Sequence, residues 1–262
     1  MKDVQKTQVK KTVHHKKRRR RRYKASGRFY VILVLLFVIV AGIILSRTVF
    51  FNISKFTLAG DSPYSLEEML SAAGIKEGDN LFSMNFEYPE QKLLDTFPYI
   101  ESVKMERNLP YTLKITVKKS EACMNITAED GSFYVVSKSN RILEKGLTEA
   151  KEGIVTILGY EPKDIPVCKT LSSDDASKDK LVKEIIKSLD ESELTATAID
   201  ITDKNIIYVN HTNNLRIKIG EPTDIEYKLE LAKAIISQRG NPNEFGTINV
   251  ESTEYPSFMA NQ

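Results

Sequence analysis

The longest apolar stretch of the chain runs from Phe29 to Ser46, between Arg28 and Arg47. It holds 18 residues and no charged side chain. As an α-helix it would be about 27 Å long, close to a hydrocarbon core of about 30 Å. The pattern predicts an uncleaved transmembrane helix over 29–46. The alternatives are a buried helix of a soluble protein and a cleaved signal peptide, whose apolar region is usually shorter.

Basic residues crowd the segment before this helix. Residues 1–28 hold 13 Lys or Arg and one acid, Asp3, for a net charge of +12. Because the whole chain has a net charge of +3, residues 29–262 together carry a net charge of −9. By the positive-inside rule we expect a cytoplasmic N-terminus and an extracellular C-terminal part. The residues expected to orient the chain are Arg18, Arg19, Arg20, Arg21, Arg22, Lys24 and Arg28.

The basic tail allows three interpretations. It is a topology signal without a partner, a surface that attracts anionic lipid headgroups, or a nuclear-localisation run. We favour the first two together. Binding to nucleic acid is not expected, because the positive charge is confined to the tail. His14 and His15 are interpreted as flanking polar residues, since the cations beside them oppose metal binding.

After the helix, polar and apolar residues follow a mixed pattern of strands and helices. Lys55 to Gly60 alternates as a strand, and the tetrapeptide Ser65–Glu68 reads as a capping box that opens a helix ended by Gly74. A second helix is predicted from Tyr88 to Phe97. Two further strands are predicted, with Val103 and Met105 on one face of the first and Leu113, Ile115 and Val117 on one face of the second.

This order of strand, helix, helix, strand and strand resembles a POTRA (polypeptide-transport-associated) domain. The turn with Gly78, Asn80, Leu81 and Phe82, and the run from Pro98 to Val117, look like the bacterial cell-division family called DivIB or FtsQ. The basic N-terminus and acidic remainder resemble its Gram-positive branch. Lys119 and Ala122 depart from the acidic residue and proline that often follow the last strand in that family.

The second half of the extracellular part is less regular. Short strands are predicted at Phe133–Val136 and Ile154–Leu158, then a helix from Asp175 to Leu189. A three-stranded meander, a helix and a last strand follow. The meander is expected at Ala198–Thr202, Ile206–Asn210 and Leu215–Ile219, the helix at the second capping box Thr223–Glu226 with its end at Gly240, and the last strand at Thr247–Glu251.

These patterns predict an α+β protein in five parts. They are a cytoplasmic basic tail (1–28), the transmembrane helix (29–46), a POTRA domain (51–119), a mixed β-rich domain with two helices (120–252) and a C-terminal tail (253–262). Two cysteines, Cys123 and Cys168, exclude a disulfide-dense scaffold. We expect two buried free thiols, and a single disulfide is the alternative.

No motif for common enzyme chemistry occurs in the sequence. HExxH, GxSxG, CxxC and GxxxxGK[ST] are all missing, so we predict no catalytic residue, metal ligand or cofactor. The one histidine of the extracellular part, His211, is interpreted as an exposed turn residue rather than a general base. A non-enzymatic division scaffold is therefore expected. The alternatives are a membrane-anchored cell-wall enzyme with an unrecognised active site and a eukaryotic single-pass protein glycosylated at Asn52 or Asn125.

The family resemblance also implies partners and a docking surface. Members bind the small bitopic division proteins FtsL and DivIC (the counterpart of FtsB) at the septum, and the implied contact is the exposed edge of the closing strand. An edge strand has unpaired N–H and C=O groups to which a partner strand can add. We expect that edge at Thr247, Ile248, Asn249, Val250, Glu251 and Ser252. The alternative is an internal strand whose Ile248 and Val250 serve the core.

Overall fold

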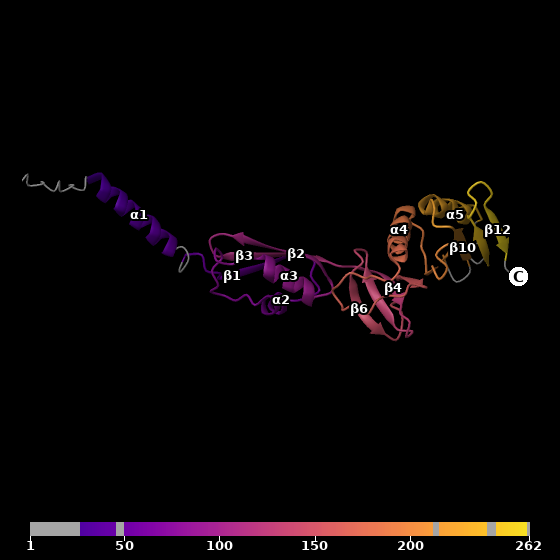
Figure 1. The fold of residues 1–262 in the computed structure, drawn as a ribbon, viewed down its shortest axis with the longest axis horizontal. Coiled ribbons are helices and arrows are strands. Elements are labelled where there is room, and N and C mark those ends of the chain that lie inside the picture. The colour runs from indigo at the N-terminus through magenta and orange to yellow at the C-terminus, as the bar shows by residue number, and fades with distance from the viewer. Residues whose placement is uncertain (1–26, 46–49, 212–214, 240–244, 261–262) are drawn as a thin grey trace, which may run out of the picture. The chain divides into compact units, whose positions relative to one another are not determined.

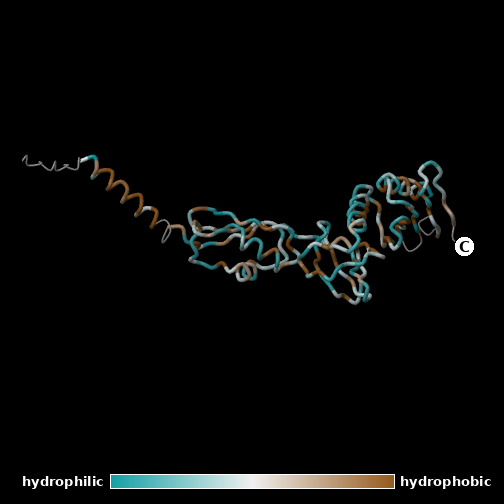
Figure 2. The backbone as a smooth tube through the Cα atoms, viewed as in Figure 1, coloured by the Kyte–Doolittle hydropathy of each residue, from teal (hydrophilic) through white to brown (hydrophobic). Residues whose placement is uncertain are grey.

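The computed structural model describes residues 27–45, 50–211, 215–239 and 245–260. The chain divides into two units, Met1–Ser46 and Arg47–Gln262. The first contains helix α1 (Gly27–Leu45), none of whose side chains is buried. Among the described residues it is the one helix long and apolar enough to cross a membrane, and Figure 2 shows that hydrophobic residues make up most of it. The predicted span was 29–46; of the orienting residues, only Arg28 lies inside the described ranges.

The second unit begins with a three-stranded sheet (Figure 1). Its strands are β1 (Lys55–Gly60), β2 (Ile100–Asn108) and β3 (Thr112–Lys119), in the order β1-β3-β2, with β1 parallel and β2 antiparallel to β3. Helices α2 (Leu66–Ala73) and α3 (Glu87–Thr96) pack on it. The predicted order of elements is confirmed.

Local sequence explains how α2 starts and stops. Ser65 accepts a hydrogen bond from the Glu68 N–H, and the Glu68 carboxylate accepts one from the Ser65 N–H, so the predicted capping box forms. Gly74 ends the helix in the left-handed conformation, with φ of 74°. Between these caps Met69 and Ala73 are buried in the core of this domain, as their spacing predicts.

The first strand ends at a glycine for a steric reason. Gly60 has φ of 87°, and a Cβ there would stand 2.0 Å from the Val117 carbonyl oxygen. Only glycine combines that backbone conformation with so close an approach to β3. The parallel pairing of β1 with β3 therefore depends on it.

A nine-stranded sheet follows, in the order β12-β11-β10-β9-β8-β7-β4-β5-β6. Helices α4 (Ala176–Ser192) and α5 (Ile225–Arg239) share one apolar core with it. The strands are β4 (Ala122–Thr127), β5 (Phe133–Ser137), β6 (Ile142–Leu147), β7 (Val155–Leu158), β8 (Ala198–Asp200), β9 (Ile207–Asn210), β10 (Leu215–Gly220), β11 (Gly246–Asn249) and β12 (Ser257–Ala260).

Several predictions for this domain are confirmed. The meander forms, because β8, β9 and β10 pair consecutively and antiparallel. Asp175 caps α4 by accepting the Ser177 N–H, although the helix continues to Ser192. Cys123 and Cys168 are both free thiols, the second of them buried.

Two predictions near the C-terminus are wrong. The second capping box does not form: α5 begins at Ile225, directly after Asp224, whose φ of 52° is left-handed. The last strand of the chain is not Thr247–Glu251, because residues assigned to a C-terminal tail form β12 and pair with β11. Four-residue β12 is too short to show a convincing alternation of its own. The predicted end of α5, Gly240, lies outside the described residues.

Candidate partner-docking edge

Strand β12 forms one end of the nine-stranded sheet (yellow in Figure 1). It pairs antiparallel with β11, where Thr247 lies opposite Met259 and Ile248 opposite Phe258. Within the described ranges no strand pairs with its other side. We call this side the β12 edge.

The direction of the backbone groups on the β12 edge follows from one hydrogen bond. The Val250 N–H donates to the Lys218 carbonyl at 3.0 Å, so Val250 and, by alternation, Ile248 turn their backbone groups toward β10. Thr247 and Asn249 therefore turn theirs toward β12 and bond to Met259 and Ser257 across the pair. The N–H and C=O groups of Phe258 and Ala260 consequently face away from β11.

The side chains divide the strand pair into a buried and an open face. Ile248 and Val250 are fully buried, and Phe258 packs against the same core. Thr247 and Asn249 are partly exposed, and Met259 is exposed on the same face. A partner strand added to the β12 edge would thus meet an apolar face on one side and a polar one on the other.

Charged groups on the open face are paired with each other. The Lys218 ammonium lies 2.6 Å from the Glu251 carboxylate, and this hydrogen bond raises the pKa of Lys218. The Arg216 guanidinium lies over the Tyr208 ring at 3.8 Å and 3.5 Å from Asp200. Since these pairs are substantially solvent-exposed, we expect them to contribute little to stability.

Large apolar side chains are exposed on β12 and at both ends of the β11–β12 pair. Tyr255 is 80% exposed and Met259 59%, and Phe245, directly before β11, is 57% exposed. Exposed large apolar residues are common on protein-binding surfaces. The β12 edge thus offers both backbone groups and apolar anchors.

The predicted site residues fall next to this edge rather than on it. Thr247–Asn249 lie in β11, between β10 and β12, and Val250–Ser252 follow that strand. The prediction that they form the free edge is wrong, and the alternative of an internal strand with Ile248 and Val250 in the core is confirmed. The edge strand Ser257–Ala260 was not predicted, because four residues with Phe258 and Met259 adjacent show no alternation.

A second group of contacts joins the two sheets. The Arg141 guanidinium, from the turn between β5 and β6, donates to the carbonyls of Leu94, of Phe97 at 3.5 Å and of Pro98 at 3.3 Å. Leu94 lies in the last turn of α3, where carbonyls lack helix partners and no basic residue of the helix itself is present. Arg141 thus supplies the cation that the end of α3 favours.

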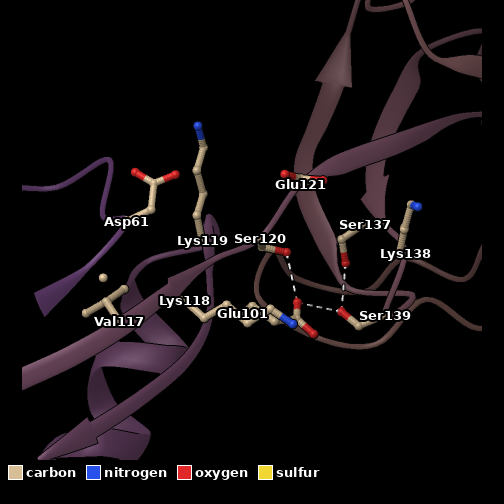
Figure 3. A pocket seen from close by; sticks show the side chains of 11 residues that line it. Asp61, Glu101, Val117, Lys118, Lys119, Ser120, Glu121, Ser137, Lys138 and Ser139 are labelled. Atoms are coloured by element: carbon tan, nitrogen blue, oxygen red, sulfur yellow. Dashed lines mark hydrogen bonds between the residues drawn. The ribbon is translucent and has the colours of Figure 1, made fainter.

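Polar contacts continue along this joint (Figure 3). Glu101 of β2 accepts hydrogen bonds from Ser120 at 3.0 Å and Ser139 at 2.8 Å, beside a cavity of about 500 Å³ lined by both domains. The Lys151 ammonium lies 2.8 Å from Glu144 and 2.9 Å from the Tyr99 hydroxyl. The hydrogen bond from Lys151 is the main cause that lowers the pKa of Glu144.

The described residues contain no group of three or more His, Cys, Asp or Glu side chains able to hold a metal ion. His211 is partly exposed at the end of β9, with Nδ1 2.5 Å from the Thr195 carbonyl oxygen. Desolvation of the partly buried Cys123 raises the pKa of its thiol to about 11, which favours the protonated form at neutral pH.

The sequence of the first sheet domain matches a known protein-family model. Residues 51–119 match the family model described as a POTRA domain, FtsQ-type. Over 192 residues the chain is 27% identical to the cell division protein DivIB of Clostridium botulinum, covering 72% of this chain and 73% of that protein. The DivIB of Clostridium acetobutylicum is 25% identical over 192 residues, covering 72% and 76%. The cell division protein FtsQ of Corynebacterium glutamicum is 22% identical over 182 residues, covering 67% and 78%.

Proposed function

Because the chain belongs to the DivIB/FtsQ family of cell division proteins, we propose that it is a non-enzymatic scaffold of the division septum. In this proposal α1 anchors the protein in the cell membrane, and the second unit binds other division proteins outside the cell. The observation that carries the proposal is the β12 edge, where a partner strand can add to the sheet by main-chain hydrogen bonds.

We propose small bitopic division proteins of the FtsL and DivIC type as the partners. An extended segment of such a protein would bond to the backbone groups of Phe258 and Ala260 and place side chains against Met259 and Tyr255. Thr247, Asn249, Glu251 and Ser252 are proposed to contribute through the open face beside the edge, with Ile248 and Val250 supporting it from the core.

Ala260 allows a sharp test of the edge. Proline at this exposed position removes an N–H that faces away from β11 and puts its ring in the path of a partner strand. Serine at the same position keeps the N–H. We expect Ala260→Pro to weaken binding of the DivIC extracellular domain by about tenfold or more, a loss of about 1.4 kcal/mol, and Ala260→Ser to bind like the parent.

The measurement is titration of the full chain, held in lipid nanodiscs, with the labelled DivIC domain. Asn249→Pro is a useful comparison, because it removes a donor from the β11–β12 pair rather than from the free edge. Equal affinities of the parent and Ala260→Pro would refute docking at the β12 edge. Loss of binding in both Ala260 variants would point to misfolding of β12 instead.

Orientation is tested separately. The basic tail predicts that a reporter active only outside the cytoplasm is active after Gln262 and inactive before Phe29. Neutral residues in place of Arg18–Arg22 should produce a mixture of orientations, because five of the 13 basic residues before α1 are then lost. A reporter that is active before Phe29 and silent after Gln262 would reverse the proposed topology.

A further inference from the structure

Exposed apolar side chains in the first sheet domain lie at one end only. Between Phe50 and Lys119 the exposed large apolar residues are Phe50 (64% exposed), Phe82 (47%), Tyr88 (72%), Leu109 (51%) and Tyr111 (49%). Backbone contacts bring them to the same end of the domain. We name these five residues the apolar rim.

The start of the domain holds two members of the apolar rim together. The Leu81 N–H donates to the Phe51 carbonyl at 2.8 Å, and Asn52 forms an isolated bridge with Asn80. The Phe51 and Phe82 rings meet edge to face, with centroids 4.6 Å apart. Phe50 and Phe82 therefore lie beside the first described residues of this unit.

The turn between β2 and β3 joins them there. The N–H groups of Ser54 and Lys55 both point to the Tyr111 carbonyl, at 3.0 and 3.3 Å. The Arg107 side chain, at the end of β2, donates to the carbonyls of Leu81 and Met84 at 2.6 and 2.7 Å. Leu109 and Tyr111 thus adjoin the same loop that carries Phe82 and leads into α3, where Tyr88 lies.

The opposite end of this domain has a different character. There Glu101, Lys119 and Ser120 form the polar joint with the second sheet (Figure 3). No large apolar side chain of 50–119 is exposed at that end among the described residues. Apolar exposure that is confined to one end of a domain indicates a surface that is covered in use.

Chain length limits what can cover the apolar rim. Five residue steps separate Leu45, the last residue of α1, from Phe50, so an extended chain spans at most about 18 Å between them. With α1 in a bilayer, the apolar rim stays within reach of the headgroup layer. Phe, Tyr and Leu are side chains that bury their apolar parts at that boundary, about 5 to 10 Å deep.

We propose that the apolar rim docks on the surface of the bilayer that holds α1, inserting Phe82, Leu109 and Tyr111 among the lipid headgroups. The inference rests on the proposed anchoring by α1. Such docking would fix the first domain at the membrane and leave the second domain, with its β12 edge, to reach partners. Charged residues of both signs, such as Lys55 and Glu77, lie at this end, so apolar insertion rather than net charge is the driving term.

The absence of tryptophan from the chain permits a direct test. The full chain with Tyr111→Trp is reconstituted in phosphatidylcholine vesicles whose lipids carry bromine near the top of the acyl chains. We expect its fluorescence to be quenched at least about twofold more than that of Tyr255→Trp, which reports from the C-terminal end. Because the vesicles contain no other protein, a protein partner cannot cause this quenching.

A further variant separates insertion from mere closeness to the anchor. Tyr111→Trp combined with Phe82→Ser and Leu109→Ser keeps the tryptophan and the tether but removes two members of the apolar rim. We expect its quenching to fall to the level of Tyr255→Trp. Equal quenching with and without the two serines, or no quenching in Tyr111→Trp, would overturn the proposal. The apolar rim would then be covered by the membrane anchor of another protein instead of by lipid. Co-flotation of every variant with the vesicles checks the anchoring by α1 independently.

Discussion

Replacement of Ile115 by alanine is expected to lower the free energy of unfolding of the first sheet domain by about 2–5 kcal/mol. Ile115 is fully buried in β3, the central strand of its sheet, with Leu58 of β1 and Met105 of β2 as its cross-strand neighbours. The backbone of all three strands is fixed by pairing, so the site has little freedom to collapse around the lost atoms. The penalty therefore includes a cavity as well as lost transfer free energy.

The neighbouring Thr116 provides the matched control. Its side chain lies on the other face of β3 and is partly exposed, so Thr116→Ala should change stability by no more than about 0.5 kcal/mol. Both variants are compared as full chains in detergent micelles by chemical denaturation followed with circular dichroism. An Ile115→Ala protein that unfolds at the parent's denaturant concentration would contradict the assigned burial of β3.

Replacement of Arg141 by alanine is expected to cost about 2–3 kcal/mol and to separate the unfolding of the two sheet domains. The partly buried guanidinium donates hydrogen bonds to the carbonyls of Leu94, Phe97 and Pro98, which lie 43 to 47 residues away in the sequence. Without Arg141, the last carbonyls of α3 lose a charged hydrogen-bond donor. The two sheet domains are then held together mainly by the solvent-exposed contacts of their joint.

Lys169 supplies the comparison for this second prediction. Its ion pair with Asp95, at 2.8 Å, crosses the same joint but is about half exposed on both sides. Removal of such a pair typically costs less than about 1 kcal/mol, so Lys169→Ala should retain a single transition. Calorimetry of both variants in detergent micelles measures the difference. If Arg141→Ala also unfolds in one transition at the parent's temperature, the joint does not depend on Arg141.

Neither change should alter the β12 edge directly. Ile115 belongs to the core of the first sheet and Arg141 to the joint, whereas the proposed docking groups lie at the far end of the nine-stranded sheet. Measuring the binding of DivIC to the two variants therefore tests whether docking requires a rigid joint between the sheet domains. The variants Ala260→Pro and Ala260→Ser test where the docking occurs.

The sequence by itself determined the elements whose signals are local. A run of 18 uncharged residues indicates a membrane-length helix, and alternation over six to nine residues predicted β1, β2 and β3. The Ser65 capping box also formed as predicted, because all its atoms belong to four consecutive residues. The same motif at Thr223 failed, since Asp224 adopts a left-handed conformation before α5 begins.

Only the tertiary structure decided which strand is the edge and what crosses the joint. Four-residue β12 has too few positions for periodicity to distinguish a strand from a tail, and its place depends on pairing with β11. The partner carbonyls of Arg141 are equally invisible in sequence, because they are brought to it by the folding of another domain. Every residue except proline carries the same backbone N–H and C=O groups, so their pairing depends on where the fold places each strand.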